Sequence, residues 1–126
     1  MKRSWLGFGL LLVLLVLSLA ATGILTRAHE QTVLELELSS DAALLGDWED
    51  VHLLLRRADR RWTKWAHIFA CFADHGPVEQ IDADFAVLDV CRQSRQAESY
   101  RVACTRLAKQ ITDLAEAQAL TWWNLF

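Results

Sequence analysis

The chain has 126 residues and a formal net charge of −3, from 13 basic and 16 acidic side chains. Lys2 and Arg3 precede a long apolar segment, so residues 27–126 carry 11 basic and 16 acidic side chains, a net charge of −5. This length holds one small domain after the apolar segment. A mildly acidic domain gives no electrostatic reason to expect nucleic acid as a partner.

The apolar segment, residues 5–25, reads "WLGFGLLLVLLVLSLAATGIL" and contains no charged side chain. About twenty helical residues rise about 30 Å, which is the thickness of the hydrocarbon core of a bilayer. The two basic residues lie before the segment, so the positive-inside rule predicts a cytoplasmic N-terminus and an extracytoplasmic domain. We therefore predict a single-pass protein of the cell membrane, anchored through residues 1–27, with an outer domain over residues 28–126.

A cleaved signal peptide is the alternative for this segment. Residues 18–20 and 26–28 loosely fit a small-x-small cleavage site, although the apolar run is longer than a usual signal core. Cleavage would leave a secreted helical protein. Both interpretations place the domain outside the cytoplasm.

The rest of the chain predicts helices. Residues 30–45 alternate in part like a strand, but no second strand exists to pair with them, and Glu, Leu and Ala favour a helix, which can continue directly from the apolar segment. Gly46 is expected to end this helix and Asp47 to cap the next one. Residues 48–75 place one set of apolar side chains on a single helical face: Val51, Leu54, Leu55, Ala58, Trp62, Trp65, Phe69 and Phe72.

Gly76 and Pro77 are expected to separate this helix from a third one, residues 78–94. That helix has apolar side chains on two sides, which predicts cover from two directions. After a short turn at 94–98, residues 98–117 place a further apolar set on one face: Tyr100, Ala103, Cys104, Leu107, Ile111 and Leu114. The predicted fold is all-α, an N-terminal transmembrane helix followed by a small antiparallel bundle of about four helices in two αα-hairpins.

A histidine and three carboxylates, Asp74, His75, Glu79 and Asp82, gather near Gly76-Pro77 and form a candidate metal or hydrolytic site. A continuous helix would put His75 and Glu79 on one face, but the proline between them disfavours that. The favoured interpretation is a structural corner, in which His75 ends one helix and Glu79 lies in the first turn of the next. A pairing of His75 with Asp74 or Asp82 across this corner is expected.

Two further surfaces are candidates for contact. Five cations on one helical face form a possible basic contact face toward anionic lipid or envelope polymer: Arg56, Arg57, Arg60, Arg61 and Lys64. Solvation, or pairing with acidic neighbours such as Asp59, Asp82, Asp84 and Asp89, is the favoured alternative. The aromatic tail, with Trp122, Trp123 and Phe126, packs on the bundle, enters the membrane interface or contacts a partner.

Three cysteines follow the apolar segment. Cys91 and Cys104 are nearly equidistant from the turn at 94–98, so they form either a disulfide or a pair of buried thiols. Cys71 falls on the polar face of its helix and is a candidate for pairing between molecules.

Several short motifs resemble a known family. They are Trp48 after a helix cap, Trp62 and Trp65 three apart, "DH" at 74–75, "EQID" at 79–82 and "NLF" at 124–126. This succession is similar to the domain-of-unknown-function family numbered 4363, a set of small single-span bacterial proteins with an outer helical domain. The resemblance covers most of the chain, although Gly76-Pro77 and Trp122-Trp123 depart from the family's pattern. It implies the fold and the membrane topology, and it implies no activity.

These observations favour a non-catalytic interaction or scaffold module at the cell envelope. The expected contacts are the lipid bilayer through residues 5–25 and a protein partner. No cofactor, metal or small-molecule substrate is indicated, because no Gly-rich phosphate loop or nucleophile elbow is present in the sequence.

Overall fold

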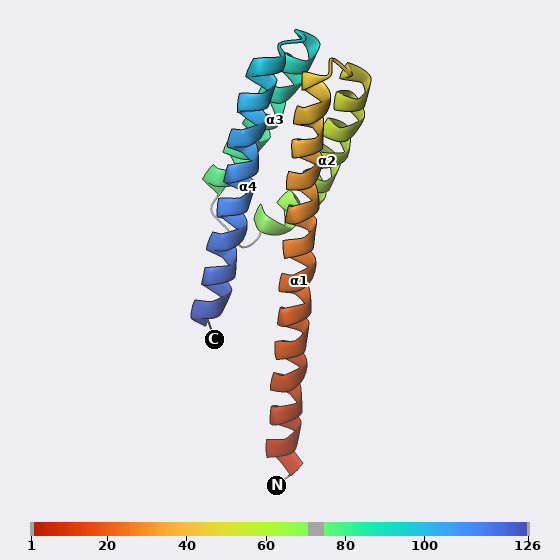
Figure 1. Cartoon of the computed structure of the whole chain (residues 1–126). Helices are drawn as coiled ribbons and strands as arrows, with labels where there is room; N and C mark the ends of the chain where they lie inside the picture. The colour runs from red at the N-terminus through yellow and green to blue at the C-terminus, as the bar shows by residue number, and fades with distance from the viewer. Residues whose placement is uncertain (1, 71–74, 126) are drawn as a thin grey trace.

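The computed structural model describes residues 2–70 and 75–125, and all of its secondary structure there is helical (Figure 1). The helices are α1 (Lys2–Leu44), α2 (Trp48–Ala70), α3 (His75–Gln93) and α4 (Ala97–Leu125). The prediction of an all-α fold that begins with an apolar helix is confirmed.

α1 is one uninterrupted helix of 43 residues, which corresponds to a length of about 64 Å. Its beginning, Lys2–Ala20, is long and apolar enough to cross a membrane, and none of it is buried inside the protein. Its later part is different, because Leu36, Ser39 and Ala43 are buried among the other helices. The apolar segment and the first helix of the bundle are therefore the same helix.

The end of α1 follows the predicted chemistry. Gly46 has a φ of 74°, in the left-handed region that favours glycine. The backbone N–H of Gly46 donates to the Ala43 carbonyl (3.1 Å), and that of Asp47 donates to the Ala42 carbonyl (3.0 Å), which is the hydrogen-bond pattern of a Schellman motif. Asp47 then caps α2 by accepting a hydrogen bond from the Asp50 backbone N–H through its carboxylate (3.2 Å).

The corner between α2 and α3 differs from the prediction. α2 ends at Ala70, and His75 is the first residue of α3 and does not end α2. Pro77 lies in the first turn of α3, where its missing N–H removes no intrahelical hydrogen bond. Glu79 consequently lies just beyond that first turn. His75 and Glu79 share one helix, contrary to the expectation that Pro77 would separate them.

The turn between α3 and α4 is a second Schellman motif. The backbone N–H of Arg95 donates to the Arg92 carbonyl and that of Gln96 donates to the Cys91 carbonyl, both at 3.1 Å. Arg95 takes the left-handed position with a φ of 53°, although glycine is favoured there. The predicted turn at 94–98 is confirmed in position.

Each helix packs against two others (Figure 1). α1 contacts α2 and α4, and α3 contacts the same two helices from the opposite side. The core contains most of the predicted apolar faces of α2 and α4. Leu54 is only half-buried and is not part of the core. The side chains of Phe69 and Phe72 are outside the described part. The largest side chains that are fully buried include Trp62, Tyr100, Leu36, Ile81, Leu88, Leu107 and Ile111.

The prediction that α3 is covered from two directions is wrong. Ile81, Phe85 and Leu88 face the core, but Val87 is 50% exposed and Val90 is 60% exposed. Four helices leave each member with one outer side, and on α3 this side carries valines. An exposed apolar surface is thus present at the end of the bundle that lies far from the N-terminus of α1.

Candidate functional site

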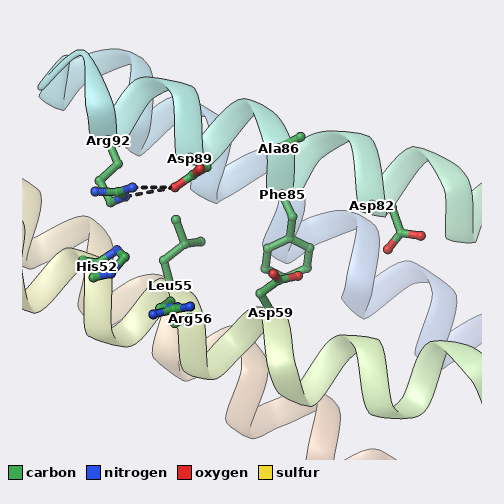
Figure 2. Close-up of a pocket in the computed structure, with 9 residues that line it drawn as sticks. All are labelled: His52, Leu55, Arg56, Asp59, Asp82, Phe85, Ala86, Asp89 and Arg92. Atoms are coloured by element: carbon green, nitrogen blue, oxygen red, sulfur yellow. Dashed lines mark hydrogen bonds and ion pairs between the residues drawn. The ribbon is translucent and has the colours of Figure 1, made fainter.

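The packing between α2 and α3 is the least extensive of the four neighbouring pairs, and it leaves a cleft. The cleft has a volume of about 520 Å³ (Figure 2). Leu55 and Phe85 form its apolar floor, because both are buried core residues. The complete lining is His52, Leu55, Arg56, Asp59, Asp82, Phe85, Ala86, Asp89 and Arg92.

Charge is unevenly distributed along this cleft. Figure 2 shows His52, Arg56 and Arg92 gathered near one end and Asp82 at the other end. Arg92 donates from Nε (3.0 Å) and Nη2 (2.8 Å) to Asp89 Oδ1 one helical turn away. This pair partly compensates the opposite charges of the two residues. Because it lies at the surface, it contributes little to stability.

Asp59 lies in the middle of the cleft, opposite Phe85. Partial burial raises the pKa of its carboxyl group, and the negative charges of Asp82 and Asp89 raise that pKa further. The negative charges of Asp82 and Asp89 therefore repel the ionised form of Asp59. An ammonium or guanidinium group would relieve this repulsion, whereas an anion would be disfavoured at this position.

Asp82 closes the other end of the cleft by bonding to α2. The Trp62 indole N–H donates to Asp82 Oδ1 at 2.7 Å. Trp62 is only 1% exposed, so this hydrogen bond connects the surface of α3 to the core of α2. Asp82, a member of the acidic cluster predicted from the sequence, thus has a structural role, because its Oδ1 accepts this hydrogen bond.

The rest of that predicted cluster is only partly described. Asp74 lies outside the described residues, as does the side chain of His75, so the expected pairing across the corner stays a prediction. Glu79 is exposed on α3. Within residues 2–70 and 75–125, no three His, Cys, Asp or Glu side chains come close enough together to hold a metal ion.

The five residues of the predicted basic face have different surroundings in the structure. Arg57 and Arg60 are exposed, and Arg56 borders the cleft. Lys64 places its Nζ 5.8 Å from the centre of the Trp65 ring, within the range of a cation–π contact. These four residues remain available to solvent.

Arg61 instead turns toward α1. Its Nη1 lies 2.7 Å from Glu35 Oε1, and the two side chains are 32% and 12% exposed. Its partner is none of the acidic residues that the sequence suggested. The two residues lie 26 positions apart on different helices, and no local sequence signal could have identified the pair.

A buried polar cluster joins α1 and α4. The Tyr100 hydroxyl donates to Ser39 Oγ (2.9 Å), and Ser39 donates to the Leu36 carbonyl (2.7 Å). Cys104 Sγ lies 3.7 Å from Ser39 Oγ. Burial raises the pKa of the Cys104 thiol to about 11, which keeps it protonated and unreactive at neutral pH.

Cys104 and Cys91 are both free thiols. Of the two alternatives from the sequence, the structure therefore has thiols and no disulfide between them. Cys104 is buried and Cys91 is half-buried. Cys71 lies outside the described residues.

A second groove lies between α1 and α4, on the side toward the apolar end of α1. It has a volume of about 530 Å³, and residues Thr26 and Glu30 of α1 face Thr112 and Glu116 of α4 across it. His29, which also lines it, is 5% exposed and packs with its ring centre 6.4 Å from that of Trp62. Burial lowers the pKa of His29 to about 4, so this imidazole is neutral at physiological pH.

The aromatic tail extends α4, which continues as a helix to Leu125. The side chains of Trp122 and Trp123 and the whole of Phe126 are outside the described part of the chain. The sequence left three alternatives for this tail: packing on the bundle, entering the membrane interface or contacting a partner. No described side-chain contact decides between them.

No family model, no curated protein and no solved structure matches the chain. The resemblance to the domain-of-unknown-function family 4363 therefore stays a prediction.

Proposed function

We propose that the protein is a single-pass membrane protein whose outer helical domain acts, without catalysis, as an interaction or scaffold module at the cell envelope. The continuity of α1 carries this proposal. A helix that is apolar and exposed over Lys2–Ala20 and buried in a bundle after Thr32 joins an anchor to a folded domain with no linker between them. Such a connection holds a surface at a fixed height and angle above a bilayer.

The placement of basic residues supports the orientation. Lys2 and Arg3 precede the apolar segment, and the next charged residue is Arg27. The positive-inside rule then puts the N-terminus in the cytoplasm and the bundle outside. The antiparallel arrangement of the four described helices, read as two αα-hairpins, gives the domain a compact form.

A non-catalytic role is supported by how the polar groups are used. Asp82 bonds to Trp62, Arg92 to Asp89, and Arg61 to Glu35. Each of these pairs joins or stiffens helices. The Ser39–Tyr100–Cys104 cluster is buried in the same way. These charges and hydroxyls support the packing, and this is the chemistry of a scaffold.

The membrane-distal valines are the best candidates for the protein contact. Val87 and Val102 line a shallow groove of about 400 Å³ between α3 and α4, and they are 50% and 64% exposed. Glu98 and Arg106 border the same groove. Apolar side chains with charged neighbours are the usual composition of a protein contact surface.

Photo-crosslinking in cells tests this proposal. A photoreactive amino acid at Val102 is expected to capture a discrete protein, and the same amino acid at Lys109, exposed on the same helix, is expected to capture it far less. If neither position captures a protein above the background of an unirradiated sample, the interaction role is wrong.

The topology is tested separately with alkaline phosphatase fused after Phe126, which folds only outside the cytoplasm. We expect an active fusion together with an intact mass that retains residues 1–27. An inactive fusion would contradict the orientation, and a mass lacking the N-terminal segment would establish the secreted alternative.

A further inference from the structure

α4 is longer than its neighbours and extends in the direction of the apolar half of α1. α2 has 23 residues and α3 has 19, whereas α4 has 29. Figure 1 shows the blue end of α4 passing beyond the lower ends of α2 and α3 and reaching the level of the red-orange part of α1. The extra length is therefore directed toward the bilayer of the proposed topology.

The register between the two helices fixes how far α4 reaches. Tyr100 meets Ser39 at the distal end, and Glu116 shares a groove with Thr26 nearer the apolar segment. The helices are antiparallel, so each step forward along α4 matches one step back along α1. Continuing this register at the same rise per residue places residues 118–125 beside about residues 15–23 of α1.

Charge ends at the same height on both helices. Toward the C-terminus the last charged residue of α4 is Glu116, and residues 117–126 read "AQALTWWNLF". Toward the N-terminus the last charged residue of α1 before the apolar segment is Arg27. Glu116 lines the same groove as Thr26, the neighbour of Arg27 in sequence. The charged residues of both helices thus end at about the same level. This is expected where two helices pass through one boundary between water and an apolar medium.

The composition of the tail also fits this medium. Residues 117–126 carry no charged side chain, and five of them are large and apolar: Leu120, Trp122, Trp123, Leu125 and Phe126.

We propose that the last turns of α4, residues 117–125, enter the outer leaflet of the bilayer beside α1. Nine helical residues rise about 13 Å, close to the thickness of one leaflet's hydrocarbon layer. The domain would then be held by two helices, one that crosses the bilayer and one that enters its outer leaflet. This inference rests on the proposed single-pass topology and adds a second lipid contact to it.

A second membrane contact has a mechanical consequence. One helix alone permits rotation about its own axis, whereas a second helix beside it in the same leaflet restricts tilting of the domain. The orientation of the distal valine surface relative to the membrane is then defined by both helices.

Depth-dependent quenching of tryptophan fluorescence tests the proposal on the full chain. The protein is reconstituted into vesicles of phosphatidylcholine and phosphatidylglycerol, with or without bromine atoms on the acyl chains. The double variant Trp122→Phe/Trp123→Phe and the variant Trp5→Phe are compared with the unsubstituted protein. Trp48→Phe, at the distal end of the bundle, is the matched control, and circular dichroism verifies that each variant keeps its helicity.

We expect the emission that is lost in the double variant to be quenched by brominated lipid about as strongly as the emission lost in Trp5→Phe. The emission lost in Trp48→Phe is expected to be unaffected by bromine. If the Trp5 component is quenched and the tail component is not, the tail lies outside the leaflet and this inference is overturned, while the single-pass topology stands.

Two other outcomes also count against the inference. Tail emission that is blue-shifted and yet unquenched by bromine would mean that protein covers the tail, as a second copy of this chain would. If neither the tail component nor the Trp5 component is quenched, the apolar segment is not in the bilayer and the proposed topology fails with the inference.

Discussion

At the residue scale, the hydrogen bond between Trp62 and Asp82 joins the core of α2 to the surface of α3. Asp82→Ala removes a charged acceptor from this indole and is expected to lower the free energy of unfolding by about 1–2 kcal/mol. Asp82→Asn keeps an acceptor oxygen and should cost less. Chemical denaturation of the full chain in detergent micelles measures both values.

The matched control for Asp82 is Glu79→Ala, an exposed carboxylate on the same helix, which should change stability by no more than about 0.5 kcal/mol. Equal effects of the two substitutions would mean that the Trp62 contact contributes nothing.

Arg61 and Glu35 provide a second test at this scale. Glu35 Oε2 is buried without a hydrogen-bond partner, so Glu35 relies on Arg61 to compensate its charge. Arg61→Ala should lower the free energy of unfolding by about 1–2 kcal/mol, a value reduced by the partial exposure of the pair. Arg60→Ala, one position earlier and exposed, should have little effect. A larger loss for Arg60→Ala than for Arg61→Ala would contradict the assigned pair.

His29 predicts a pH dependence of stability. Its pKa in the folded state is about 4, below the ordinary value of 6.5 for an unburied histidine. As the pH falls from 6.5 to 4, the unfolded chain takes up a proton that the folded chain does not, so stability decreases over this window by up to about 3 kcal/mol. Above pH 6.5 this histidine contributes no slope.

Unfolding midpoints measured at several values between pH 7 and pH 4 check this prediction. His29→Gln should reduce the loss relative to the unsubstituted protein, while His52→Gln, at a half-exposed position, should retain it. Identical pH profiles for His29→Gln and the unsubstituted protein would show that His29 does not cause the effect.

At the element scale, the turn after α3 contains a residue that is not ideal for its backbone. Arg95 occupies the left-handed position of a Schellman motif, which costs a non-glycine residue about 1–2 kcal/mol. Arg95→Gly removes this strain and gains flexibility in the unfolded chain, so a net stabilisation of about 0.5–1 kcal/mol is expected. Thermal unfolding measures it.

The control for Arg95 is Gln93→Gly, in the last residue of α3, where the same substitution should be destabilising. A destabilising Arg95→Gly would mean that the Arg95 side chain makes a contact more valuable than the strain it imposes.

The elements also show what the sequence can and cannot predict. Gly46 and Asp47 were predictable because a helix end depends on a few adjacent residues. The apolar faces of α2 and α4 were predictable because helical periodicity is local. The α2–α3 corner was misplaced, since Pro77 is equally acceptable at several positions of a first helical turn.

The contacts of the candidate cleft were beyond sequence reasoning for a different reason. Trp62 and Asp82, like Glu35 and Arg61, lie on separate helices, and their meeting depends on the register in which those helices pack. The burial of α3 also depends on how the helices pack. Its two apolar sides led us to predict cover from two directions. Which side faces water is decided by the neighbours available and not by the side chains of α3.

At the scale of the whole molecule, the apolar segment and the folded domain share one helix, α1 (Lys2–Leu44). In the proposed topology, an uninterrupted α1 transmits the tilt of its apolar segment directly to the bundle. Arg27→Pro, at the boundary between the two parts, would remove a backbone hydrogen bond and kink the helix there. The orientation of the domain should then vary widely, while the bundle itself keeps most of its contacts.

A distance measurement between two spin labels tests this claim most directly. The labels are carried by unnatural amino acids at Leu17 and Glu37, both exposed on α1, in the full chain reconstituted in lipid nanodiscs. We expect a single narrow distance distribution centred at about 30 Å for the twenty residue steps from Leu17 to Glu37, and a broader, shorter one for Arg27→Pro. A broad or short distribution in the chain without the proline would show a hinge between anchor and domain and contradict the account.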